Sequence, residues 1–230
     1  MESHEPLIQD LVELEPIKLW SLIVTLLGDL SGDEITGKQL RAILQPIRIK
    51  PEATRVAIHR LKQDDWIVAE KAGREASYKL SSKGTSETSR VYEDVYRQDV
   101  KYPDGWRLMI TAKACQDMSE LSPRICVGRN LCLVPREVDL SGSDALDVEI
   151  VKYPLPEWFQ MRFLEDGVLE TAQKLMVFAG RVEGLELNHD TQSSFRLLLL
   201  HRWRKMALRP ACWAHISMMP DGPIAQCHRL

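Results

Sequence analysis

The chain has 230 residues, of which 44% are apolar and 27% are charged. This composition excludes a disordered or low-complexity chain, and the length corresponds to one large domain or two to three small ones. No apolar run approaches the ~20 residues of a transmembrane helix, and the acidic start lacks the apolar stretch of a signal peptide. The odd number of cysteines favours free thiols in a reducing cytoplasm over a disulfide framework.

The net charge of −3 argues against general binding to polyanions, but the charge is unevenly distributed. Residues 1–34 contain eight acids and one base, whereas residues 35–83 contain eleven bases and five acids, a net charge of +6. The remaining residues, 84–230, have a net charge of only −2. The basic block is a feature of nucleic-acid-binding domains, so its sequence is the first place to look for function.

Apolar residues at helical spacing predict a short helix over residues 7–14 and a longer one over residues 19–30. Thr36 is a suitable N-cap for the next helix, and Pro51 can open another that runs from Glu52 to about Asp64. After these helices the period changes to two. Two short strands are therefore predicted at residues 66–70 and 77–80, around a basic loop.

The helix after Pro51 has two unlike faces. Thr54, Ala57, Ile58 and Leu61 share the inner face, and basic residues occupy the outer one. Three helices followed by a hairpin are typical of a winged helix, whose third helix enters the major groove of DNA. We predict base reading by Arg55, His59 and Lys62, and phosphate contacts by Lys38, Arg48, Arg60, Lys71 and Arg74. The alternative is an ordinary solvated helix beside a basic hairpin.

Three segments carry a resemblance to a known family. They are residues 21–29 (SLIVTLLGD), 53–62 (ATRVAIHRLK) and 195–205 (FRLLLLHRWRK), and they resemble the PaaX family. The resemblance implies a winged helix, a central ferredoxin-like domain and a helical C-terminal domain. It also implies a homodimeric transcriptional regulator. The founding members repress genes of phenylacetic acid degradation and release DNA on binding phenylacetyl-CoA.

The rest of the chain has strands and helices in separate regions. Strands are predicted at residues 106–111, within 125–135 and at 145–151, with helical spacing from residue 157 onward. The fold class is therefore α+β. The predicted parts are a winged-helix domain with an N-terminal helical extension (1–83), a linker helix (84–100), a central ferredoxin-like domain (101–153) and a C-terminal helical domain (154–230).

Two clusters near the C-terminus have competing interpretations. The basic end of the last long helix either complements the helix dipole or binds an anion such as the phosphates of coenzyme A. The candidate ligand residues are His201, Arg202, Trp203, Arg204 and Lys205. The second cluster either binds zinc or consists of idle buried residues near the chain end. It comprises Cys212, His215, Cys227 and His228.

The sequence contains no nucleophile elbow, Walker loop or zinc-protease motif, so no catalytic residue is predicted. We expect a cytoplasmic, homodimeric, DNA-binding repressor of a catabolic operon, without a cofactor or a resident metal and without contact to a membrane. An acyl-CoA effector is expected to relieve repression, on the resemblance alone. The alternatives are a nucleic-acid- or thioester-processing enzyme targeted by its winged helix, and a module that binds a partner protein.

Overall fold

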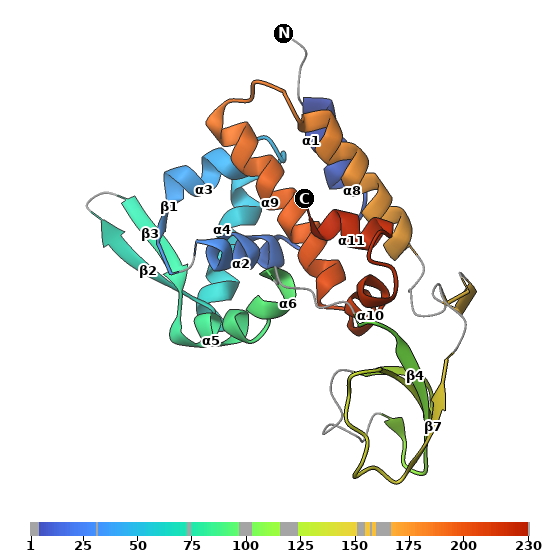
Figure 1. The fold of residues 1–230 in the computed structure, drawn as a ribbon. Coiled ribbons are helices and arrows are strands. Elements are labelled where there is room, and N and C mark those ends of the chain that lie inside the picture. Colours follow the sequence, from blue (N-terminus) through green and yellow to red (C-terminus); the bar gives the residue numbers. More distant parts are fainter. Residues whose placement is uncertain are drawn as a thin grey trace. The chain divides into compact units, whose positions relative to one another are not determined.

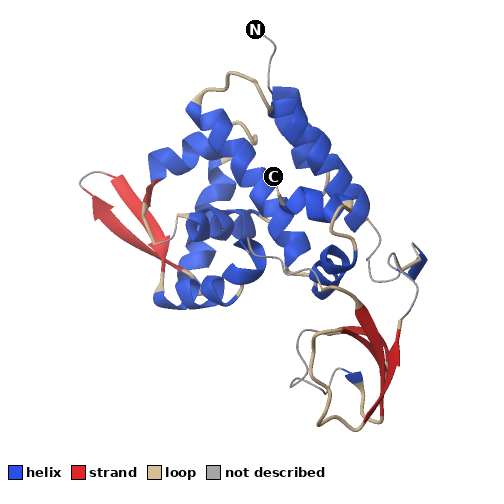
Figure 2. Cartoon of the chain, viewed as in Figure 1, coloured by secondary structure: helices blue, strands red, loops and turns tan. Residues whose placement is uncertain are grey.

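The computed structural model contains both helices and strands, which confirms the α+β class (Figures 1 and 2). It forms two compact units, each made of two separate stretches of chain. Unit 1 contains residues 1–97 and 174–208, and unit 2 contains residues 98–173 and 209–230. The residues that the structure describes are 5–30, 32–72, 75–96, 103–115, 124–150, 155–156, 158–159 and 167–229.

Unit 1 is built mainly from helices, with a small sheet that extends from them (Figure 1). The first part of the chain supplies α1 (Glu5–Glu13), α2 (Leu19–Asp29), β1 (Ile35–Thr36), α3 (Gly37–Leu44), α4 (Pro51–Gln63), β2 (Ile67–Ala72), β3 (Glu75–Leu80), α5 (Ser82–Arg90) and α6 (Tyr92–Tyr96). The last part supplies α9 (His189–Ala207), and α8 (Val168–Val182) begins in unit 2 and ends in unit 1.

The starts of α3 and α4 follow directly from their sequences. Thr36 and Gln39 form a capping box at α3, in which each side chain accepts a hydrogen bond from the other residue's backbone N–H. Lys50 is extended, and Pro51 then occupies the first turn of α4, where a missing N–H costs nothing. Both predicted helix starts are confirmed.

The sheet of unit 1 has the order β1-β3-β2, with antiparallel pairing throughout. Strand β1 was not predicted, because two residues are too few to show a period of two in the sequence. The Ser77 hydroxyl donates to a Glu34 carboxylate oxygen at 2.7 Å, which fixes β3 to the chain entering β1. The hairpin is therefore held by a third strand and by a side-chain contact.

Helix α5 begins tightly against the base of this hairpin. The Ser81 hydroxyl accepts from the backbone N–H of Gly84 and donates to the carbonyl of Asp65 at 2.6 Å. A Cβ at Gly84 would lie 2.2 Å from the carbonyl oxygen of Trp66. The absence of a side chain at residue 84 therefore lets α5 pack on the turn between α4 and β2.

Helix α9 passes through the middle of unit 1 and packs on α1, α2, α3 and α6. Its Arg202 side chain is 1% exposed and donates to the carbonyl oxygens of Leu11, Val12 and Glu15 at 3.0, 3.0 and 2.6 Å. These are the last carbonyls of α1 and of the turn after it, which lack partners within the helix. Arg202 thus fixes α1 to α9 across 187 or more residues of sequence.

Unit 2 contains a four-stranded antiparallel sheet. Its strands are β4 (Trp106–Thr111), β5 (Ile125–Gly128), β6 (Leu131–Pro135) and β7 (Ala145–Glu149), in the order β5-β6-β4-β7. Strand β6 lies between β4 and β5, which is the strand order of a split βαβ unit. The unit also contains α10 (Pro210–Met218) and α11 (Pro223–His228), together with the first residues of α8.

The chain between the paired strands of unit 2 departs from the complete ferredoxin-like pattern. Residues 136–144, between β6 and β7, form turns instead of a second crossover helix. The guanidinium of Arg107 fixes this segment by donating to the carbonyl of Val138, and it also pairs with Asp147 at 2.7 Å. The sheet order therefore fits the predicted central domain, whereas this connection does not.

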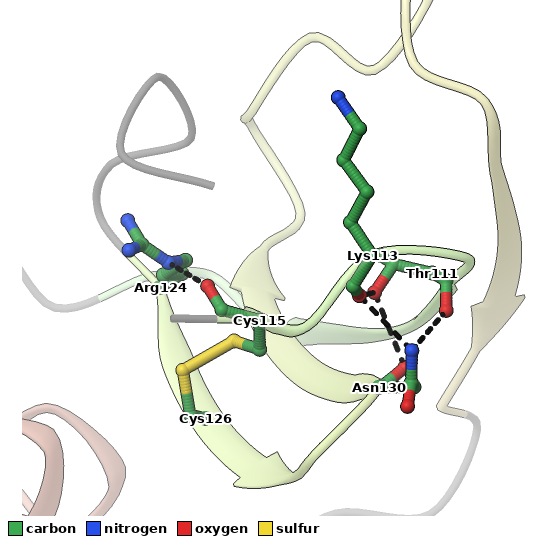
Figure 3. The surroundings of a disulfide bond; sticks show 6 residues. All are labelled: Thr111, Lys113, Cys115, Arg124, Cys126 and Asn130. Atoms are coloured by element: carbon green, nitrogen blue, oxygen red, sulfur yellow. Dashed lines mark hydrogen bonds between the residues drawn. A yellow bond between two sulfur atoms is a disulfide. The ribbon is translucent and has the colours of Figure 1, made fainter. Parts of the chain in front are cut away.

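One cysteine pair differs from the expectation of free thiols. Cys115 and Cys126 form a disulfide, which joins the segment after β4 to the start of β5 (Figure 3). Next to it, the Asn130 side-chain amide donates to the carbonyls of Thr111, Ala112 and Lys113, so that this loop is held on two sides. Cys132, Cys212 and Cys227 are free and buried. Spacing in the sequence could not reveal which two thiols the sheet brings together.

The two units also divide the chain differently from the predicted domains. Within the expected linker helix over residues 84–100, the described residues, up to Tyr96, form two helices, α5 and α6, which are separated at Val91 and belong to unit 1. The expected C-terminal domain over residues 154–230 is divided, because α9 is part of unit 1 whereas α10 and α11 are part of unit 2. The physical reason is the contact of α9 with four helices from the first 97 residues.

Candidate nucleic-acid interface

The outer face of α4 presents a group of cations to solvent. Arg55, His59 and Lys62 recur at i, i+4 and i+7, and Arg60 lies beside them. All four side chains are exposed, and none makes a hydrogen bond or ion pair with another described residue. Their charge and hydrogen-bonding capacity are therefore available to another molecule.

The opposite face of α4 is buried at three of its four predicted positions, and Ile58, the fourth, is partly buried. Thr54, Ala57 and Leu61 are 6%, 7% and 2% exposed, respectively, and α4 packs on α2 and β2. Val56 is an exception to the apolar pattern, because its side chain is 53% exposed on the outer side between Arg55 and Arg60. Val56 was not among the predicted site residues, although its position outside the apolar stripe of α4 was a usable signal.

The structure describes only some of the side chains that are predicted to contact phosphates. Lys38 on α3 is exposed, and Arg48 is exposed in the turn before α4, with a positive φ of 58°. The Lys71 side chain and all of Arg74 lie outside the described residues. An exposed ion pair at 3.9 Å between Arg41 on α3 and Glu75 on β3 adds to the contact between this helix and the hairpin.

Comparison with known proteins identifies the segment that carries this surface. Residues 18–84 match the family model described as PaaX-like protein. These residues are similar to a PaaX-like domain. The resemblance to the PaaX family found in the sequence is thereby confirmed, and the domain contains α2, α3, α4 and the hairpin.

One curated protein similar to this chain is the Transcriptional repressor PaaX of Escherichia coli strain K12. The two are 34% identical over 115 residues, which is 48% of this chain and 36% of the relative. The matched region thus spans little more than a third of the length of that repressor. No helix in the described part of the chain is long and apolar enough to cross a membrane.

Most of the residues predicted to bind an anionic ligand make contacts within unit 1. Arg202 binds the α1 carbonyls described above, and Lys205 pairs with Glu15. The indole N–H of Trp203 donates to the carbonyl of Val95 at 2.7 Å. His201 is 2% exposed, and its Nδ1 lies 3.1 Å from the Thr25 hydroxyl.

His201 is neutral at physiological pH. Burial lowers its pKa to about 4, and the nearby charges of Arg202, Lys205 and Arg204 act in the same direction. A neutral imidazole with one nitrogen at a hydroxyl is suited to packing inside unit 1 and does not attract an anion. The basic end of α9 therefore serves mainly to hold α9 in place.

Arg204 is the exception among these five residues. Its side chain lines a cavity of about 340 Å³ within unit 1, and its guanidinium Nη1 meets only the Thr25 hydroxyl, at 3.4 Å. Desolvation lowers the pKa of Arg204, and none of the described carboxylates lies within ion-pair distance of it. The cavity is also lined by Val24, Gly28, Leu80, Thr85, Thr88, Val91, Tyr92, Val95 and Tyr96.

The residues of the alternative zinc site lie in unit 2. Cys212, His215 and Cys227 are buried in unit 2, at 1%, 0% and 6% exposure. Burial raises the pKa values of Cys212 and Cys227 to about 12 and lowers that of His215, which keeps all three groups neutral. The part of the chain that the structure describes contains no group of three or more His, Cys, Asp or Glu side chains able to hold a metal ion.

Proposed function

We propose that this chain is a DNA-binding transcriptional repressor that uses α4 as its recognition helix. The observation that carries the proposal is the row of exposed cations on α4, inside the segment that matches the PaaX-like model. The order of a helix, a short strand, two further helices and a hairpin, from α2 to β3, agrees with a winged helix. The printed name of the E. coli relative, a transcriptional repressor, supports the same function.

In this proposal α4 lies in the major groove. Arg55 is suited to a bidentate contact with guanine, and His59 and Lys62 are suited to neighbouring base edges. The exposed Val56 side chain, on the same side, is suited to apolar contact with a thymine methyl group. Lys38, Arg48 and Arg60 would contact phosphates together with Lys71 and Arg74 in the hairpin, which makes the affinity salt-dependent.

The finer parts of the proposal rest on the resemblance. The protein would act as a cytoplasmic homodimer on a near-palindromic operator, since two-fold symmetric proteins read two-fold symmetric sites. It would repress a catabolic operon of the phenylacetate type, and an acyl-CoA effector would release it from DNA. Release requires the effector to bind the DNA-free state more tightly than the DNA-bound state.

The test is binding of the full chain to DNA from upstream of its own gene, measured by fluorescence anisotropy at two salt concentrations. We expect tight binding that weakens with salt, because phosphate contacts release counterions. Arg55→Ala should weaken specific binding by about 1–3 kcal/mol and relax the base preference.

A matched control is Arg181→Ala on α8, which removes the same charge from an exposed pair with Asp10. This variant should bind nearly as well as the parent chain. Equal affinities of the Arg55 and Arg181 variants would contradict the assignment of α4, and no specific binding at either salt concentration would contradict the proposed function. Titration of the complex with phenylacetyl-CoA then tests the effector separately.

A further inference from the structure

The cavity beside Arg204 combines an apolar wall with a cation that has no ion-pair partner among the described residues. A guanidinium has five N–H donors, and Arg204 uses one of them, in a long contact with Thr25. The Thr25 oxygen already has two other contacts, since its hydroxyl donates to the carbonyl of Ser21 at 2.9 Å and meets Nδ1 of His201. Most of the hydrogen-bonding capacity of Arg204 is therefore unused by the described residues.

The walls of the cavity define the rest of the ligand. Val24, Leu80 and Val95 supply aliphatic surface, and the rings of Tyr92 and Tyr96 stack with centroids 4.5 Å apart. The Tyr96 hydroxyl does not offer its proton to a ligand in the cavity, because it donates to Asp29 at 3.1 Å. The cavity thus offers apolar and aromatic surface around one cationic group.

The size and charge of the site point to a compact monoanion. Ligand pockets measure about 300–1,000 Å³, and this cavity of about 340 Å³ is near the lower limit. Coenzyme A carries a nucleotide, a long pantetheine arm and several phosphate charges, for which one guanidinium and a small cavity are a poor match. A carboxylate, in contrast, matches the planar fork of a single arginine.

We propose that unit 1 binds a small carboxylic acid with an apolar or aromatic body, whose carboxylate pairs with Arg204 and whose body fills the cavity between α2, α5 and α6. Helix α2 connects the cavity to α4, because it lines the cavity with Val24, Thr25 and Gly28 and also packs on α4. An effect of the acid on DNA affinity rests on the proposed function, whereas binding of the acid does not.

The first experiment compares phenylacetate with phenylacetamide on the full chain by isothermal titration calorimetry, without DNA. The two probes share the ring and the shape but differ in charge. We expect phenylacetate to bind at least about tenfold more tightly, since hydrogen bonds to a charged group contribute more than neutral ones. This comparison uses the parent chain, so it does not depend on whether a variant folds.

The second experiment changes the arginine. Arg204→Met should lower the affinity for phenylacetate at least about tenfold, Arg204→Lys should lower it less, and the matched Arg181→Met should leave it unchanged. The proposal is overturned if the acid and the amide bind equally, if neither binds, or if Arg204→Met has no effect. Tighter, Arg204-dependent binding of phenylacetyl-CoA than of phenylacetate would also overturn it in favour of the thioester.

A third measurement keeps this proposal distinct from the proposed function. Phenylacetate is added to the complex of the chain with upstream DNA, and the anisotropy is followed. Binding of the acid in calorimetry together with a change in DNA affinity supports both proposals. Binding of the acid to a chain that recognises no DNA would support the ligand site and contradict the repressor.

Discussion

Replacing Arg202 with leucine should destabilise unit 1 more than any single surface change. The guanidinium is 1% exposed and contacts three backbone carbonyls of the segment from Leu11 to Glu15. Its Nη1 also lies 3.6 Å from the Glu15 carboxylate. Leucine fills part of the space but donates nothing, so these carbonyls lose their partner in a site that water does not readily enter.

The expected loss of unfolding free energy is about 3–5 kcal/mol, the usual effect of removing one member of a buried charged contact. For a chain of this length the corresponding drop in Tm is roughly 6–20 °C. Urea unfolding monitored by tryptophan fluorescence measures it, and Trp203 on the same helix reports on unit 1. The far-ultraviolet circular dichroism of the folded variant verifies that its helices are retained.

Arg196→Leu on α9 is the matched control. Arg196 pairs with Asp29 at 3.0 Å, but its side chain is 71% exposed, so its loss should cost no more than about 1 kcal/mol. If the Arg202 and Arg196 variants lost the same stability, burial of the guanidinium would not be what makes Arg202 important. The attachment of α1 to α9 would then depend on apolar packing alone.

Three other predictions concern buried or constrained groups. Because the pKa of His201 falls to about 4 on folding, the unfolded chain gains a proton below pH 6.5 that the folded chain does not accept until about pH 4. The free energy of unfolding should therefore decrease by about 3 kcal/mol between pH 6.5 and pH 4. His201→Gln should remove most of this pH dependence in acid titrations followed by circular dichroism. Gly84→Ala should destabilise unit 1 by about 1–3 kcal/mol in urea, because the new Cβ meets the carbonyl of Trp66 at 2.2 Å; unchanged stability would show that α5 moves freely. Cys126→Ser should lower the unfolding free energy of unit 2 by about 3 kcal/mol under non-reducing conditions, because it removes the disulfide that closes the loop from Cys115. Adding a reductant should lower the stability of the parent chain to that of the variant.

Local patterns in the sequence predicted most elements of both units. The Thr36 cap, Pro51 at the start of α4 and the change to a period of two after it are interactions between near neighbours. The strand over residues 106–111 was predicted with its observed bounds for the same reason. The cations on the outer face of α4 could also be found in this way, because the 3.6-residue period fixes which residues share a helix face.

Contacts between distant residues were not predictable from such patterns. The Cys115–Cys126 disulfide, the addition of β1 to the hairpin and the placement of α9 in unit 1 all depend on which surfaces meet after folding. The basic end of α9 shows the consequence for a candidate site. Five neighbouring residues looked alike as ligands for an anion, but folding directs Arg202 and Lys205 to α1 and leaves Arg204 in a cavity.

The sequence by itself determined where most helices and strands form, which face of α4 is basic and which family the first domain resembles, because each depends on short-range order along the chain. The tertiary structure alone decided which charged groups are satisfied internally and which remain available to a ligand. The reason is that burial and hydrogen-bond partners arise from packing between segments nearly 200 residues apart, as between α1 and α9.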